Sequence, residues 1–210
     1  MFHNFEELKH SLSTDEPKTL IVAAAHDKHT LEAVYEAAES LPMKYILVGD
    51  RVKIEEISRE MGKTPEVVID AIDDDDSAYK SVALIREGKG NVLMKGILET
   101  RTLLKAVLDK ENGIRRKASG LESHQVSSGT MSHLAMLEVP SYHKLISVSD
   151  GGMLPHPTLE QKADIIRNAS KFYHRLGIKT PIIAALAAAE AVNVRVEQKS
   201  LGRGIVAGEF

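Results

Sequence analysis

Short apolar runs alternate with amphipathic stretches through the first half of the chain. Each apolar run predicts a buried strand, and each following stretch has apolar residues at three- and four-residue spacing, which predicts a helix. The strands are expected at 19–25, 44–50, 66–72 and 91–96. The helices are expected at 27–41, 51–62, 77–90 and 99–113. This alternation is typical of stacked βαβ units around a parallel sheet.

The pattern changes after this region. Residues 114–133 are polar, rich in serine and glycine, and show no periodicity. Two runs at 134–140 and 144–150 predict strands that could pair, and 157–177 predicts a helix with Thr158 as its N-cap. Residues 182–192 predict a strand that runs into a short helix.

Three glycines near the C-terminus, Gly202, Gly204 and Gly208, predict a loose tail rather than a helix or strand. We therefore expect an α/β protein with two domains. The first is a parallel α/β domain over 1–139, and the second is a smaller α/β domain over 140–210.

Composition narrows the classes of function. The chain has 210 residues, 43% of them hydrophobic, and a formal net charge of -3, which does not favour nucleic-acid binding. No apolar run is long enough to span a membrane, and the N-terminus lacks the apolar core of a signal peptide. The absence of cysteine excludes disulfides, thiol nucleophiles and thiolate metal sites. We expect a cytoplasmic protein.

Several common site motifs are missing. No glycine-rich dinucleotide or Walker-type phosphate motif follows the predicted strands. The nine histidines lack a tight ligand spacing, so no metal site is expected. Ser132 is not expected to be a nucleophile, because the surrounding "GTMSH" is no nucleophile elbow.

Two strand ends carry candidate chemistry. Lys95 and Gly96 end the fourth predicted strand, and Arg101 lies one turn into the next helix. These residues form either an ordinary solvent-exposed turn or a site at which two cations and a close backbone hold an anion. Asp150 and Gly151 end a later strand, and they form either an ordinary Asp-Gly turn or a site with an acid and exposed amides.

Four stretches in order resemble the phosphate acetyl/butyryltransferases. They read "VAAAHDKHTLEAVYEA", "LMKGILETRTLLKAVLDKENGIR", "MSHLAMLEVPSYHKLISVSDGGM" and "PTLEQKADIIRNASKFYHRLGI". The likeness is closer to the phosphate butyryltransferases, through Met-Lys-Gly, the Ser-His before "LAMLEVP", and the "TLEQKADII" helix.

The resemblance implies two α/β domains around a cleft, as in the isocitrate and isopropylmalate dehydrogenases. It implies transfer of a short acyl group, butyryl or acetyl, between coenzyme A and inorganic phosphate. Coenzyme A would be a substrate, with no tightly bound cofactor, and the protein would form a homodimer or a larger homo-oligomer.

The resemblance also suggests roles for individual residues. Lys95, Gly96 and Arg101 would line the phosphate side, with Ser132 and Gly151 also binding substrate. A thiol has a pKa of about 8.5, so its attack on the acyl group needs a base. His133 and Asp150 are the candidates for this catalytic role.

The sequence departs from the family pattern in two places. After Asp150 it reads "GMLPHP", and after Asn193 it does not match the family's continuation, which carries residues assigned to catalysis. We therefore expect the chain as given to be a poor catalyst. The alternative is a truncated, non-catalytic homologue that binds an anion or coenzyme A or supports subunit association. A decarboxylating dehydrogenase would need metal-binding aspartates and a dinucleotide site, neither of which is evident.

Overall fold

The computed structural model describes residues 2–11, 17–114, 130–186 and 206–209. The chain divides into two compact units. The N-terminal unit is Thr14–Arg116, and the C-terminal unit combines Met1–Ser13 with Lys117–Phe210.

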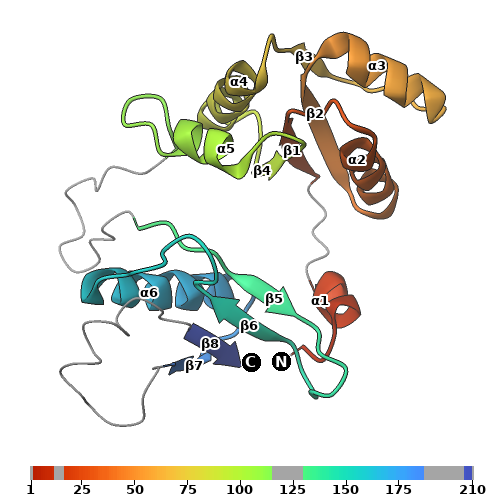
Figure 1. Ribbon diagram of the computed structural model, residues 1–210. Helices are drawn as coiled ribbons and strands as arrows, with labels where there is room; N and C mark the ends of the chain where they lie inside the picture. Colours follow the sequence, from red (N-terminus) through yellow and green to blue (C-terminus); the bar gives the residue numbers. More distant parts are fainter. Residues whose placement is uncertain (1, 12–16, 115–129, 187–205, 210) are drawn as a thin grey trace. The chain divides into compact units, whose positions relative to one another are not determined.

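The N-terminal unit is built on a parallel sheet with strand order β3-β2-β1-β4 (Figure 1). Its strands are β1 (Lys18–Ala23), β2 (Met43–Gly49), β3 (Val68–Asp70) and β4 (Val92–Lys95). Its helices are α2 (Lys28–Ser40), α3 (Arg51–Glu60), α4 (Asp74–Arg86) and α5 (Thr100–Val107). The alternating strands and helices expected from the sequence are confirmed.

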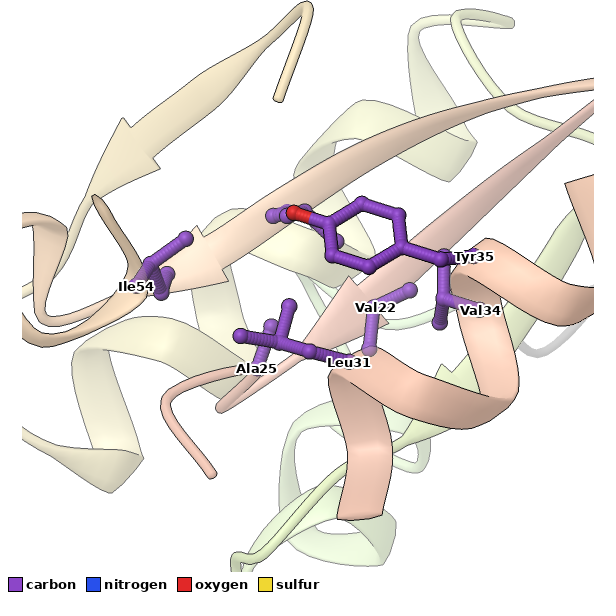
Figure 2. Close-up of a cluster of buried hydrophobic side chains, with 7 residues drawn as sticks. Val22, Ala25, Leu31, Val34, Tyr35 and Ile54 are labelled. Carbon is purple, nitrogen blue, oxygen red and sulfur yellow. The ribbon is translucent and has the colours of Figure 1, made fainter. Parts of the chain in front are cut away.

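Helices cover both faces of this sheet, because successive strand residues point to opposite sides. Val22 of β1 packs in a cluster with Leu31 and Val34 of α2 and Ile54 of α3 (Figure 2). Its neighbour Ile21 is also buried and belongs to a second cluster that includes residues of α4. A strand that is buried on both faces explains the continuous apolar run in β1.

Aspartates are the N-cap residues of three helices in this unit. The side chains of Asp27, Asp50 and Asp73 accept hydrogen bonds from backbone amides in the first turns of α2, α3 and α4. These bonds satisfy amides that have no partner within the helix. Because Asp73 is the cap, α4 begins at Asp74, before the predicted start at residue 77.

The helix α5 ends at Val107, earlier than the predicted end at residue 113. The side chain of Asp109 accepts hydrogen bonds from the amides of Glu111 and Asn112. This local side-chain bonding holds a turn where the apolar spacing alone suggested more helix.

The C-terminal unit has an antiparallel sheet with strand order β5-β6-β8-β7. Its strands are β5 (Ala135–Leu137), β6 (Ile146–Ser149), β7 (Ile182–Ala185) and β8 (Val206–Glu209). Its helices are α1 (Phe5–Ser11) and α6 (Leu159–Arg175). The expected pairing of the two runs at 134–140 and 144–150 is confirmed, and the expected domain division after residue 139 lies between β5 and β6 of this sheet.

The expectation of a loose tail around Gly208 is wrong. Residues Val206–Glu209 form β8, in which Gly208 lies opposite Ser147 of β6 and Ile183 of β7. Pairing on both sides gives this strand a full set of backbone partners, and tertiary context outweighs the low strand preference of glycine. The short helix expected after β7, and residues 115–129 of the polar segment, lie outside the described residues.

The helix α6 has the predicted start. Thr158 and Gln161 form a capping box, in which each side chain bonds the backbone of the other residue. Tyr173 of α6 is fully buried and packs in a cluster with Leu145. Within the described ranges, no helix has both the length and the apolar character needed to cross a membrane.

Candidate functional site

The parallel sheet of the N-terminal unit reverses its strand order beside β1. The chain passes outward from β1 to β2 and β3, and then returns to the other side of β1 as β4. In open α/β sheets, ligands bind outside the carboxyl ends of the strands where the order reverses. Lys95 is the last residue of β4 and therefore lies at this position.

The side chain of Lys95 folds back onto its own turn. Its ammonium donates hydrogen bonds to the carbonyl oxygens of Gly96, at 3.0 Å, and Leu98, at 2.9 Å. An ammonium has three donors, so these bonds leave one donor for a ligand. The two carbonyls fix a positive charge just before α5.

Only glycine fits at position 96, because two backbone segments are in close contact there. A Cβ atom at this position would lie 2.2 Å from the carbonyl oxygen of Ala24 and 2.7 Å from that of Ala23. The amide of Gly96 donates to the carbonyl of Ala23 at 2.7 Å. This amide therefore joins β4 to β1, while the expectation that Gly96 lines the phosphate side stays a prediction.

The N-terminus of α5 differs from the other capped helices. Its N-cap residue, Glu99, makes no side-chain capping bond, whereas α2, α3, α4 and α6 are all capped by a side chain. Arg101 lies in the first turn of α5 and is exposed. Among the described residues, no hydrogen bond or ion pair joins Arg101 to a partner. The amide of Thr102 donates to the carbonyl oxygen of Glu99 at 3.0 Å, so the earlier amides of the first turn are the ones that face a ligand. These amides, the helix dipole and two cations together favour an anion.

His26 lies at the same edge of the sheet, three residues after the end of β1, and was not singled out from the sequence. Its Nε2 atom is 4.0 Å from Oδ1 of Asp74, and its Nδ1 atom is buried with no hydrogen-bond partner in the described structure. The sequence signal was its position directly before the α2 cap, Asp27.

In the C-terminal unit, the structure brings together the predicted residues from two segments. The hydroxyl of Ser149 donates to the backbone carbonyl of His133 at 2.6 Å. A Cβ atom on Gly151 would lie 3.8 Å from Nδ1 of His133. The segment that contains Ser132 and His133 therefore lies against the carboxyl end of β6.

Asp150 has one occupied and one free oxygen. Its side chain is buried, and Oδ1 accepts hydrogen bonds from the amides of Gly152, at 3.1 Å, and Met153, at 3.0 Å. Oδ2 is buried and has no hydrogen-bond partner in the described structure. A buried acceptor without a partner is costly, so this oxygen calls for a partner such as a water molecule, an ion or a ligand. His133, the other catalytic candidate, is exposed.

Asn168 also belongs to this group, although the sequence analysis missed it. Its Nδ2 atom donates to the carbonyl oxygen of Thr130 and to the hydroxyl of Ser132, both at 3.0 Å. The available signal was an asparagine beside Ala169 on the apolar side of the predicted helix. Ser149 was also missed, although Ser147 and Ser149 are small polar residues at buried alternate positions of β6.

The structure thus forms two groups of predicted residues. The first, in the N-terminal unit, contains Lys95, Gly96 and Arg101. The second, in the C-terminal unit, contains Ser132, His133, Asp150 and Gly151. Within the parts of the chain that the structure describes, no group of three or more histidine, aspartate or glutamate residues could hold a metal ion.

Comparison with solved structures places the fold among the phosphotransacylases. A branched-chain phosphotransacylase from Enterococcus faecalis V583 superposes with a TM-score of 0.64 and 26% identity, over 85% of this chain and 59% of that chain. A phosphotransacetylase from Streptococcus pyogenes shares the fold, with a TM-score of 0.63 and 12% identity, over 92% of this chain and 65% of that one.

Sequence comparison defines the family. The family model described as phosphate acetyl/butaryl transferase matches residues 53–200. A probable phosphate butyryltransferase of Bacillus subtilis is 35% identical over 86% of this chain, and the phosphate butyryltransferase of Clostridium acetobutylicum is 32% identical over 93%. The chain belongs to this family of acyltransferases. It spans 56% and 62% of the length of these two relatives.

Proposed function

We propose that this protein transfers a short-chain acyl group, butyryl or acetyl, between coenzyme A and inorganic phosphate. The observation that most supports this proposal is the N-terminus of α5, which is positively charged, lacks a side-chain cap and lies where the strand order reverses. Membership of a family whose curated relatives are named phosphate butyryltransferase and phosphate acetyltransferase supports the same reaction.

The residues of the N-terminal unit suit the phosphate. Lys95 contributes one free ammonium donor, and Arg101 can hold two phosphate oxygens with its planar guanidinium group. Amides in the first turn of α5 can add further donors. When the acyl phosphate is cleaved, these groups stabilise the negative charge that develops on the leaving phosphate.

The residues of the C-terminal unit suit the thiol and the acyl group. In one direction, the sulfur of coenzyme A attacks the acyl carbonyl, a C–S bond forms, and the bond from the carbonyl carbon to the phosphate oxygen breaks. The thiol proton must leave, and the free Oδ2 atom of Asp150 is the better-placed acceptor of the two candidates because it is buried and lacks a partner. His133 is the alternative base. Ser132 and Gly151 border this position.

The larger assembly is part of the proposal and rests on the family resemblance. It comprises two α/β domains around a cleft, as in the isocitrate and isopropylmalate dehydrogenases, and a homodimer or larger homo-oligomer in the cytoplasm. Coenzyme A serves as a substrate, with no tightly bound cofactor, and no membrane or nucleic-acid partner is expected.

The test measures thiol release from butyryl-coenzyme A when inorganic phosphate is added, with acetyl-coenzyme A in parallel. Release that depends on phosphate supports the proposal, and the ratio of the two rates reports the preferred acyl group. A reaction without phosphate is the control for plain hydrolysis. Phosphate binding by calorimetry without thiol release would favour the alternative, a non-catalytic binding or association module.

A further inference from the structure

The two hydrogen bonds of the Asn168 side chain show which of its atoms donates. The same Nδ2 atom lies 3.0 Å from the carbonyl oxygen of Thr130 and 3.0 Å from the hydroxyl of Ser132. A carbonyl oxygen only accepts hydrogen bonds, so the amide group that faces Thr130 must be the NH₂ group. The orientation of the Asn168 side chain is therefore fixed by the backbone.

This orientation also fixes the role of Ser132. An amide NH₂ group has two hydrogens and no acceptor capacity. One hydrogen is directed to Thr130 and the other to Ser132, so the hydroxyl of Ser132 must accept. Its own hydrogen is then left to be donated elsewhere.

Ser132 lies beside the other candidate residues of the C-terminal unit. His133, the next residue, is held by the Ser149 hydroxyl through its backbone carbonyl, at the edge where the buried Asp150 has a free oxygen. The segment from Thr130 to His133 is therefore fixed from two sides, by α6 and by β6. Ser132 itself is only partly buried.

We propose that Asn168 is a positioning residue that fixes Ser132 as a hydrogen-bond donor to an oxygen atom of the substrate. The inference rests on the proposed acyltransferase function and assigns Ser132 a specific chemical role within it. The acceptor is a phosphoryl oxygen or the acyl carbonyl oxygen, both of which are strong acceptors that gain negative charge during the reaction. A hydroxyl that already accepts one hydrogen bond is a better donor of another, because the bonds polarise one another.

The decisive variants change the polarity of this contact. In Asn168→Asp, a carboxylate oxygen accepts a hydrogen bond from the Ser132 hydroxyl, which turns this donor away from the substrate. In Asn168→Ala, the contact is lost, but the hydroxyl stays free to rotate and donate. If the polarity of the contact matters, Asn168→Asp should lower kcat/KM more than Asn168→Ala does. If Asn168 has only a structural role, the fall in kcat/KM should instead follow the fall in the melting temperature of each variant.

The chain offers a matched control at Asn4. There the side-chain oxygen is the atom in use, since Oδ1 accepts from the amide of Glu7 at 2.8 Å. Asn4→Asp makes the same substitution and adds the same charge in the same unit, but keeps that hydrogen bond. It should leave kinetics unchanged.

We expect Ser132→Ala and Asn168→Asp each to lower kcat/KM about 10- to 100-fold. The double variant should be close to Ser132→Ala alone, because both changes remove one donor. A rise in KM for phosphate at constant kcat would identify a phosphoryl oxygen as the acceptor, and a fall in kcat at constant KM would identify the acyl oxygen.

The inference is overturned if Asn168→Asp behaves like the parent, if Asn168→Ala lowers kcat/KM as much as Asn168→Asp does, or if the two losses of kcat/KM multiply in the double variant.

If the parent shows no turnover, the proposed function fails, and the variants are compared by calorimetry with inorganic phosphate. Weaker phosphate binding in Asn168→Asp but not in Asn4→Asp would still support the role of Asn168. Equal phosphate binding by the parent and Asn168→Asp, or no phosphate binding by the parent, would contradict this role of Asn168.

Discussion

The two groups of candidate residues are built in opposite ways. The group in the N-terminal unit comes from seven consecutive residues, Lys95 to Arg101, and presents exposed positive charge at a helix N-terminus. The group in the C-terminal unit comes from three separate segments and centres on the buried carboxylate of Asp150. The first is suited to holding an anion and the second to moving a proton. Exposed cations and a buried acid need different surroundings, and here they lie in different units.

The largest expected effect is loss of proton transfer. Asp150→Asn keeps an oxygen for the amides of Gly152 and Met153 but removes the basic Oδ2. Loss of a catalytic base lowers kcat about 10²–10⁴-fold, measured by thiol release, with little change in the melting temperature. Asp109→Asn is the matched control, because Oδ1 of Asp109 also accepts from two backbone amides. If His133→Gln loses turnover and Asp150→Asn does not, the roles are reversed.

The next effect concerns the close backbone contact at Gly96. Gly96→Ala places a Cβ atom 2.2 Å from the carbonyl oxygen of Ala24, so β4 must move away from β1. We expect the N-terminal unit to lose about 2–3 kcal/mol of unfolding free energy in urea titrations. Gly152→Ala is the control, since a Cβ atom there meets nothing within 4 Å. Equal stability of the two variants would refute the packing argument.

Arg101→Ala tests the anion-binding half directly. We expect phosphate binding to weaken by about 1.5–3 kcal/mol, because a charge-assisted hydrogen bond is lost. Calorimetric titration with phosphate measures this change. Arg59→Ala removes the same charge from an exposed position at the end of α3 and should bind phosphate like the parent. Unchanged affinity in Arg101→Ala would exclude this side chain from the site.

A smaller effect separates helix capping from anion binding. Glu99→Ser provides the missing cap of α5 and should stabilise the N-terminal unit by about 0.5–1 kcal/mol. The serine oxygen would then compete with phosphate for the same amides. Compared with Glu99→Ala, which removes the carboxylate without adding a cap, the serine variant should be more stable and bind phosphate more weakly. Tighter binding in the serine variant would contradict an anion site at these amides.

The smallest effect is the acid response of the capped helices. Hydrogen bonding from the amide of Lys53 lowers the pKa of Asp50 below its ordinary value of 3.8. A lowered pKa in the folded state gives stability that is complete above the ordinary value and is lost as pH falls through the folded value. Asp50→Asn keeps a good N-cap but does not titrate, so its stability should fall less between pH 5 and pH 3, followed by circular dichroism. Parallel curves would show that Asp50 has no part in the acid response.

Local sequence was sufficient for the parallel half of the fold. Apolar runs such as the one that contains Val22 are continuous because both faces of the strand are buried, and they predict strands without knowledge of their partners. The same holds for Lys95, Gly96 and Arg101, whose proximity follows from the chain itself. The boundary of α5 was less accurate, since the turn at Asp109 depends on side-chain bonding that apolar spacing does not report.

Sequence by itself determined the family, the alternation of strands and helices, and the candidate residues at two strand ends. Only the tertiary structure decided that Gly208 lies in a strand, that Gly96 serves backbone packing, and that Asn168 reaches Ser132. Each of these facts depends on a contact between segments far apart in the chain. Helix periodicity and capping act over a few residues, whereas strand pairing and buried hydrogen bonds depend on which distant groups remain to be satisfied once the chain has folded.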